Sequence, residues 1–439
     1  MTEAIPKEVS GKESDPEAPP AKLMNSNFLL LWQGQLVSQI GSQAFLVGMM
    51  YWTMEATGSG SLMGLLMMLT MLPAVLLGPL GGTLADRYSR KLIIVICDVL
   101  SGIAVLVLAA LFLTEPASTE LLISCLLLVA TCVGIVQAFF RPAILAAIPD
   151  LVPPPKIAAA NSLSQFSYQF SSVLGQGTGG VVYSLLGAPF LFLIDGVTFL
   201  FSALSESFIR IPQKAPAKSL DARNALASFR KDLLYGLRYV WTWVGMRDFL
   251  LMVALVHFFA MPFIVLMPFY VELCLAEGAT WYGFMMAGFS GGSVVGYIVA
   301  GTFSLAGRMQ SRLLLLLLSV ASLLYGLLGL VSHPLVALLV VFLAGAMLGI
   351  FNVNMMTIIQ TSVKSELRGR VMGLVMTITN AASPLGMIAG GVAADLTEKN
   401  IPLIYVACGG AIVVSVLLLG SRRPVIEYLS RPIDPRQPD

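Results

Sequence analysis

Long apolar segments dominate this chain and limit what it can fold into. A helix needs about 20 mostly apolar residues to cross the hydrocarbon core of a bilayer, and the sequence holds twelve such runs. Only 11% of its residues are charged, against about 25% in a soluble domain. The sequence therefore predicts an all-α integral membrane protein. The predicted spans are residues 27–54, 60–83, 92–113, 119–140, 158–185, 189–208, 247–271, 281–304, 313–332, 335–359, 371–394 and 402–420.

Basic residues are distributed unevenly between the connecting segments. With the N-terminus in the cytoplasm, 25 of the 26 Lys and Arg residues fall in inner tails or loops, and Lys399 alone falls outside. This is a strong positive-inside pattern. It predicts an even number of spans, a multi-pass location in the cell (inner) membrane, and two cytoplasmic termini. The polar start of the chain is typical of a tail and not of a cleavable signal.

The two halves of the chain resemble each other. Residues 174–180 read Leu-Gly-Gln-Gly-Thr-Gly-Gly, and residues 385–391 read Leu-Gly-Met-Ile-Ala-Gly-Gly, at an offset of 211. Duplicated halves with a site between them are typical of secondary transporters. We expect a disordered tail over 1–24, a six-helix bundle over 25–208, a linker over 209–246 with an amphipathic helix at 229–241, a second six-helix bundle over 247–420, and a tail over 421–439.

Several functions are disfavoured by what the sequence lacks. Its five cysteines have no metal-ligand spacing, it has two histidines, and it carries no P-loop, HExxH motif or nucleophile–base pattern. A net charge of +2 gives no reason to expect nucleic acid. We expect no enzyme activity, no metal and no cofactor. The expected partners are a small-molecule substrate, protons and the lipid bilayer, with the protein acting as a monomer. A membrane sensor that has lost transport remains an alternative.

The sharpest motif lies between the second and third spans. Residues 82–91 read Gly-Thr-Leu-Ala-Asp-Arg-Tyr-Ser-Arg-Lys. This segment resembles the signature Gly-x-Leu-Ala-Asp-Arg-x-Gly-Arg-Lys of the major facilitator superfamily, and only Ser89 departs from it. The resemblance implies the superfamily's fold of two pseudo-symmetric six-helix bundles, and transport by alternating access.

The same resemblance implies a conformational latch. Asp86 would dock on the N-terminus of the eleventh span, where free N–H groups and the helix dipole favour a carboxylate. The alternative is that the basic residues of this loop only set the topology. The latch residues implied are Gly82, Asp86, Arg87, Arg90, Lys91, Arg368 and Arg370.

Other segments resemble one branch of that superfamily. Residues 140–143, 160–163, 192–195 and 366–372 are similar to drug:proton antiporter-type exporters, which include macrolide and enterobactin efflux proteins. Such antiporters carry Gly-Pro-x-x-Gly-Gly in the fifth span, whereas this chain lacks the proline. We therefore expect proton-coupled efflux of amphipathic molecules, with lysophospholipid or nutrient transport as alternatives. The small residues predict close helix packing at Gly175, Gly179, Gly180, Gly386, Gly390 and Gly391.

Polar side chains within the spans are the remaining candidates for function. Asp98, Asp195 and His257 lie at membrane depth, and the two acids have no obvious basic partner there; burial of this kind favours a protonated carboxyl. They are candidate proton-coupling groups, and a purely structural, hydrogen-bonded role is the alternative. The substrate-cavity candidates are Gln35, Gln39, Gln43, Gln137, Gln165, Tyr168, His257, Asn352 and Asn354.

Overall fold

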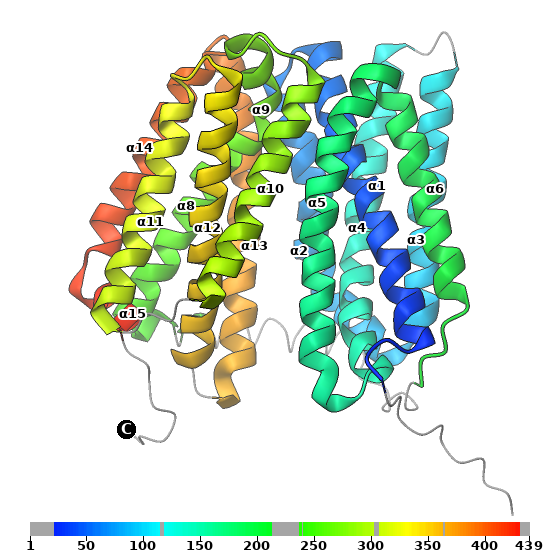
Figure 1. Ribbon diagram of the computed structural model, residues 1–439, viewed down its shortest axis with the longest axis horizontal. Helices are drawn as coiled ribbons and strands as arrows, with labels where there is room; N and C mark the ends of the chain where they lie inside the picture. Colours follow the sequence, from blue (N-terminus) through cyan, green and yellow to red (C-terminus); the bar gives the residue numbers. More distant parts are fainter. Residues whose placement is uncertain are drawn as a thin grey trace, which may run out of the picture.

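Two bundles of long helices stand side by side in the computed structural model (Figure 1). The structure describes residues 22–114, 118–212, 237–238, 240–302, 307–362 and 365–430, and within these ranges it contains helices and no strands. Both ends of the described chain lie at the same end of the molecule, which we name the termini side; the opposite end is the distal side. The predicted helix at 229–241 lies largely outside the described residues.

In the described ranges each bundle contains six long helices, and the second bundle also contains the short helices α9 and α15. The first holds α1 (Ser26–Thr57), α2 (Gly60–Arg87), α3 (Arg90–Leu113), α4 (Thr119–Leu151), α5 (Ile157–Leu186, after a 3-10 turn at Pro154–Lys156) and α6 (Ala188–Ser207). The second holds α8 (Val244–Val265), α9 (Met267–Phe269), α10 (Ala279–Thr302), α11 (Gly307–Leu328), α12 (Pro334–Ser362), α13 (Ser365–Leu396), α14 (Ile401–Ser415) and α15 (Arg423–Ser430). Two π-helical segments, Tyr270–Cys274 and Val416–Gly420, extend α9 and α14.

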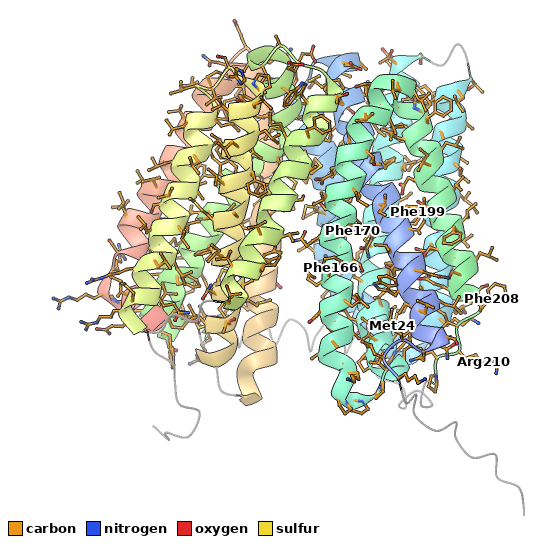
Figure 2. All side chains as sticks on the ribbon, in the orientation of Figure 1. Met24, Phe166, Phe170, Phe199, Phe208 and Arg210 are labelled. Atoms are coloured by element: carbon orange, nitrogen blue, oxygen red, sulfur yellow. The ribbon has the colours of Figure 1, made fainter. Side chains whose placement is uncertain are left out.

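Ten of the described helices are long and apolar enough to cross a membrane. The other two long helices, α1 and α5, run beside them but carry more polar residues. Side chains project from the bundles along their whole length, among them Phe166 and Phe170 of α5 (Figure 2). The predicted membrane fold is therefore confirmed.

Helix starts follow local capping chemistry. The Ser59 hydroxyl accepts a hydrogen bond from the Leu62 N–H at the start of α2, and Ser89 and Ser118 cap α3 and α4 in the same way. Helix ends agree less well with hydropathy: α4 continues to Leu151, well beyond the apolar run ending at residue 140. Hydropathy detects the hydrocarbon segment, whereas the helix extends past it.

The predicted span 247–271 is interrupted. Helix α8 ends at Val265, and Leu266 separates it from α9. Pro268 in α9 has no N–H and cannot complete a helical hydrogen bond. This missing hydrogen bond is a local reason for the interruption at Leu266. Nearby hydroxyls bond to backbone carbonyls: Tyr405 donates to Phe263 O at 3.1 Å, and Tyr270 donates to Val331 O at 2.8 Å.

The bundles meet along two helix pairs, α2 with α13 and α5 with α10. Close contact depends on glycine. A Cβ placed on Gly391 would lie 2.1 Å from the Gly60 carbonyl oxygen, and one on Gly180 would lie 2.8 Å from the Gly283 Cα. All four residues lie in the distal half of their helices, so the bundles are pressed together on that side.

The same helices are apart on the termini side. A Cβ on Gly78 or Gly82 of α2, on Gly301 of α10 or on Gly373 of α13 would meet nothing within 4 Å. The two bundles are therefore closed against each other distally and separated toward the termini (Figure 1).

We predict a matching pattern of thiol reactivity. In a cysteine-free background, Gly78→Cys and Gly373→Cys should react with a water-soluble maleimide applied from the termini side, since a thiolate forms in water and not in lipid. Leu128→Cys, at an exposed site on α4, is the lipid-facing control and should react at least tenfold more slowly. Equal labelling of all three would contradict the arrangement of the bundles.

Candidate functional site

A column of polar side chains runs through the core of the first bundle, between α1, α3 and α6. Its acidic members are Asp98 of α3 and Asp195 and Glu206 of α6, each only 1% exposed. Glycines bring α1 close to them: a Cβ on Gly41 would lie 3.0 Å from Asp195 Oδ1. Three carboxyl groups are thus enclosed within a membrane-embedded bundle.

Asp98 and Glu206 form a carboxyl pair. The two carboxyl groups lie close enough for their charges to interact, with Ser202 beside them. Asp98 Oδ2, Glu206 Oε2 and Ser202 Oγ are buried, and none of these three atoms has a hydrogen-bond partner among the described residues. From α1, Gln35 Nε2 donates to Glu206 Oε1 at 2.8 Å. The pair is therefore held by contributions from all three helices.

Electrostatics favour a bound proton on this pair. Two carboxylates about 4 Å apart would repel by about 4 kcal/mol at an effective dielectric constant of about 20. Within the described ranges, neither Asp98 nor Glu206 has an ion-pair partner. Arg141 of α4 has an exposed side chain. The geometry suits a site that binds and releases a proton.

Asp195 lies further along the same column. Ser42 Oγ donates to its Oδ1 at 3.0 Å, and its charge interacts with that of Asp98. The next residue on α1, Gln43, belongs to a different network: Gln176 Nε2 of α5 donates to Gln43 Oε1 at 2.8 Å. Helix α1 therefore joins the acidic column to α5.

The network on α5 crosses between the bundles. Ser290 Oγ of α10 donates to Gln176 Oε1 at 3.2 Å, and the Ser172 and Ser290 hydroxyls are 2.9 Å apart. These neutral groups are buried at the contact between α5 and α10. The hydrogen bonds of Ser290 with Ser172 and Gln176 must break whenever α5 and α10 separate.

Glu206 was missed by the sequence analysis because it lies near the end of its apolar segment. A signal was present, since Asp195, Ser202 and Glu206 follow each other at i, i+7 and i+11 and so share one face of a helix. The partner on α3 lies far away in the sequence, and only the fold brings Asp98 to that face.

The other predicted cavity residues are dispersed. Gln39 and Gln137 are half-buried, Gln165 and Asn352 are exposed, and Tyr168 is 44% exposed. On α12, Asn354 accepts a hydrogen bond from Gln310 at 3.2 Å. His257 on α8 is half-buried, with Nδ1 2.9 Å from the Val253 carbonyl oxygen. Of this set, the structure links Gln35 and Gln43 to the networks described above.

The motif at residues 82–91 is not docked on the other bundle in this conformation. The Asp86 side chain is 77% exposed and lies 3.8 Å from Arg90 Nη2. Arg90 ion-pairs with Asp150 at the end of α4 and donates to the Ala146 carbonyl oxygen at 2.9 Å. Arg87 and Lys91 are half-buried. Arg368 and Arg370 lie in the first turns of α13, and their side chains are outside the described part of the structure.

All six glycines predicted to serve in packing lie at close helix contacts. Gly175 and Gly179 face α1, and Gly180 faces α10 across the contact between the two bundles, which we call the seam. In the second bundle Gly386 faces Phe258 and Gly390 faces Pro262, both on α8, while Gly391 meets α2.

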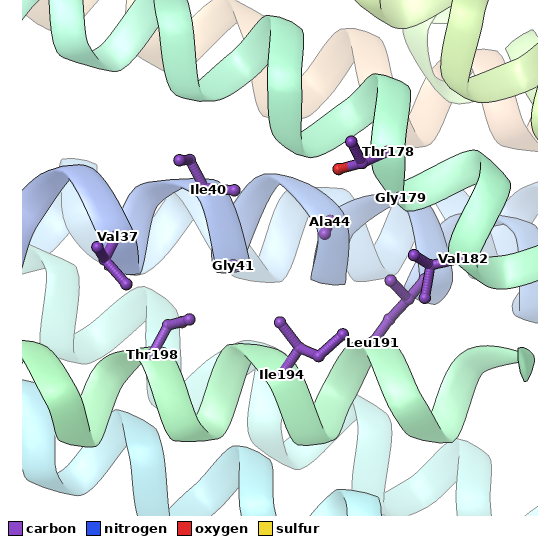
Figure 3. Close-up of a pocket in the computed structure, with 10 residues that line it drawn as sticks. All are labelled: Val37, Ile40, Gly41, Ala44, Thr178, Gly179, Val182, Leu191, Ile194 and Thr198. Atoms are coloured by element: carbon purple, nitrogen blue, oxygen red, sulfur yellow. The ribbon is translucent and has the colours of Figure 1, made fainter.

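An apolar groove of about 150 Å³ lies between α5 and α6, with α1 as its floor (Figure 3). Thr178 and Ile194 at its edges are exposed. Gly41 lies in the floor, directly over the Asp195 carboxyl. The groove is lined by Val37, Ile40, Gly41, Ala44, Thr178, Gly179, Val182, Leu191, Ile194 and Thr198.

The twelve long helices of the described ranges form two bundles that are separated on one side, an arrangement typical of secondary transporters. The model of the Major Facilitator Superfamily matches residues 31–387 and 254–432, so the chain belongs to this superfamily and is a transporter, not an enzyme. The resemblance drawn from residues 82–91 is thereby confirmed.

Individual relatives are more distant. The chain is 26% identical over 389 residues to macrolide efflux protein A of Streptococcus pyogenes, covering 85% of this chain and 90% of the relative. It is 26% identical over 409 residues to multidrug efflux pump Tap of Mycolicibacterium fortuitum, covering 89% and 93%. Its fold is similar to that of a bacterial homologue of the human lysosomal transporter Spinster, solved inward-facing and unoccupied, with a TM-score of 0.67, 16% identity, and coverage of 94% and 98%.

We predict that infrared spectroscopy will detect the proton held by the carboxyl pair. At neutral pH the protein should show a protonated-carboxyl C=O band that shifts in D₂O, because two buried neighbouring carboxyl groups are expected to retain a proton. The band should weaken in the Asp98→Asn/Glu206→Gln variant. Asp150→Asn is the control, since that acid is ion-paired with Arg90. A band that is equally strong in all three proteins would show that the pair holds no proton.

Proposed function

We propose that this protein exports small amphipathic molecules across the cell membrane in exchange for protons, with Asp98 and Glu206 as the proton-binding pair. The observation that carries the proposal is the enclosed carboxyl pair. Two neighbouring buried acids with no ion-pair partner in the described ranges are costly as carboxylates, which favours the binding of a proton.

The expected sidedness and two relatives support this direction of transport. The positive-inside pattern predicts that the termini side faces the cytoplasm, which would leave the present conformation open to the side from which an exporter takes its cargo. Two relatives that match most of the chain are named as efflux proteins. Glu206 is the residue before the end of α6, which leaves a short route for a proton to reach cytoplasmic water.

Proton movement and cargo movement would be coupled because both depend on the same change between the inward-facing and outward-facing forms. A proton bound from the outside neutralises the pair and allows the bundle to face inward, where the proton leaves. The loss of that proton creates a charge that burial disfavours, and re-protonation from outside requires the outward-facing form. Helix α1 touches both the pair, through Gln35, and the α5–α10 contact, through Gln43.

We predict that Asp98→Asn and Glu206→Gln will each lower pH-gradient-driven transport at least tenfold in inverted vesicles, while substrate exchange without a gradient persists. Amides keep the size of the side chains but cannot carry the proton. Glu398→Gln, at an exposed site beyond α13, is the matched control and should behave as the unmodified protein.

The assay needs a cargo, which a compound panel in an efflux-deficient host would supply. Full gradient-driven transport by both variants would exclude the pair as the proton site. Transport by the unmodified protein that is indifferent to the pH gradient would remove the antiport proposal altogether.

A second candidate function, movement of lysophospholipids or similar single-chain amphiphiles, is favoured by the groove of Figure 3. Its walls are apolar, and it opens between α5 and α6 beside exposed residues such as Ile194 and Val197. A hydrocarbon chain can enter there from the bilayer without crossing water.

We predict that Thr178→Phe, which narrows the groove from its exposed edge, will lower transport of a fluorescent lysophospholipid at least fivefold if this second function holds. Val197→Phe, on the neighbouring exposed face, is the control of equal size. A similar loss with both substitutions, or with neither, would argue against the groove as a lipid route.

A further inference from the structure

A carboxylate fastens the two bundles together on the distal side. Asp395, near the end of α13, receives hydrogen bonds at 2.8 Å from the backbone N–H groups of Gly60 and Ser61, the first two residues of α2. The Ser59 hydroxyl, which also caps α2, donates to Asp395 Oδ2 at 3.2 Å. A helix N-terminus in one bundle is therefore capped by an acid from the other, and this contact exists only while the distal side is closed.

The helices that carry this contact end in related sequences. Residues 82–86 at the end of α2 read Gly-Thr-Leu-Ala-Asp, and residues 391–395 at the end of α13 read Gly-Val-Ala-Ala-Asp. In both helices the aspartate is the residue before the last. Because α2 and α13 run antiparallel across the seam, Asp395 lies at the distal end and Asp86 at the termini end.

Glycines repeat the same arrangement at the helix faces. Gly60 and Gly78 are 18 residues apart on α2, and Gly373 and Gly391 are 18 residues apart on α13. Eighteen residues make five turns at 3.6 residues per turn, so both members of each pair lie on one face. Gly60 now meets Gly391, whereas Gly78 and Gly373 each face open space.

The register between the helices connects the two ends. Gly60 lies against Gly391 and Gly64 against Met387, which is an antiparallel pairing. Continuing that pairing along both helices brings Gly78 opposite Gly373. Eight residues further it brings Asp86 opposite Ser365, the first residue of α13.

We propose that Asp395 is the distal counterpart of the Asp86 latch that the family resemblance implies, so that α2 and α13 exchange caps during the transport cycle. In the present form Asp395 caps α2 and the Gly60–Gly391 contact closes the distal side. In the opposite form that contact opens, Gly78 packs on Gly373, and Asp86 caps α13. The inference goes beyond the proposed function, because it concerns the movement of the bundles and holds for any cargo or coupling ion.

Spin-label distance measurements on the full-length protein test this exchange. In a cysteine-free background, one label pair at positions 120 and 335 reports the distal side, and a second pair at 156 and 309 reports the termini side. Asp395→Asn should lower the ratio of distal-closed to distal-open molecules about two- to fivefold, the range expected for one charge at an exposed helix N-terminus. Asp86→Asn should raise the ratio by a similar factor, and Glu398→Gln should leave it unchanged.

Glycine variants provide the second arm. Gly78→Leu and Gly373→Leu should fold normally, because both sites face open space here, but each should hold the protein distal-closed in more than nine molecules of ten. Gly410→Leu, at a glycine of α14 that also has nothing within 4 Å, is the matched control and should keep the unmodified distribution. The proposal is overturned if Asp395→Asn leaves the ratio unchanged, if the two aspartate variants shift it in the same direction, or if Gly78→Leu still opens distally.

Discussion

Hydrocarbon offers no partner to a polar group, and each unpaired one costs several kcal/mol; this constraint organises the whole molecule. It forces the backbone into helices and leads hydroxyls such as that of Thr53 to donate to the carbonyl one turn earlier. It also explains the strongest local arrangements. Gln35 supplies a donor to Glu206, and Ser42 supplies one to Asp195.

The constraint also shapes the seam between the bundles. A seam that must open cannot be held by large interlocking side chains, and here it consists of backbone surfaces exposed by glycine. Gly180 against Gly283 and Gly60 against Gly391 give close contact with little side-chain entropy to lose. The Ser172–Ser290 and Gln176–Ser290 hydrogen bonds add polar contacts that neutral groups can remake elsewhere. Such a seam is tight and yet separable.

The sequence was sufficient for the fold and for part of the site. Apolar length, the distribution of Lys and Arg, and residues 82–91 together predicted the helices and the superfamily, because each is a local or compositional signal. Asp98 and Asp195 could be identified because an acidic residue within an apolar segment is evident from the sequence alone. The pairing of Asp98 with Glu206, the capping of α2 by Asp395, and the groove beside Gly41 depend on helices distant in sequence, so no local pattern predicts them. Helix ends were the weakest predictions, since α4 and α13 extend beyond their apolar segments.

The position of α1 has a mechanical consequence. Its faces touch Glu206 through Gln35, Asp195 through Ser42, and the α5–α10 seam through Gln43 and Gln176. Because the acids lie wholly within one bundle, a change in their charge cannot pull directly on the other bundle. It can act by rotating or sliding α1 against α6. If the proposed proton coupling holds, α1 is the element that would transmit a change of charge at the acids to the contact between the bundles, and a stiffer α1 would transmit more of the free energy.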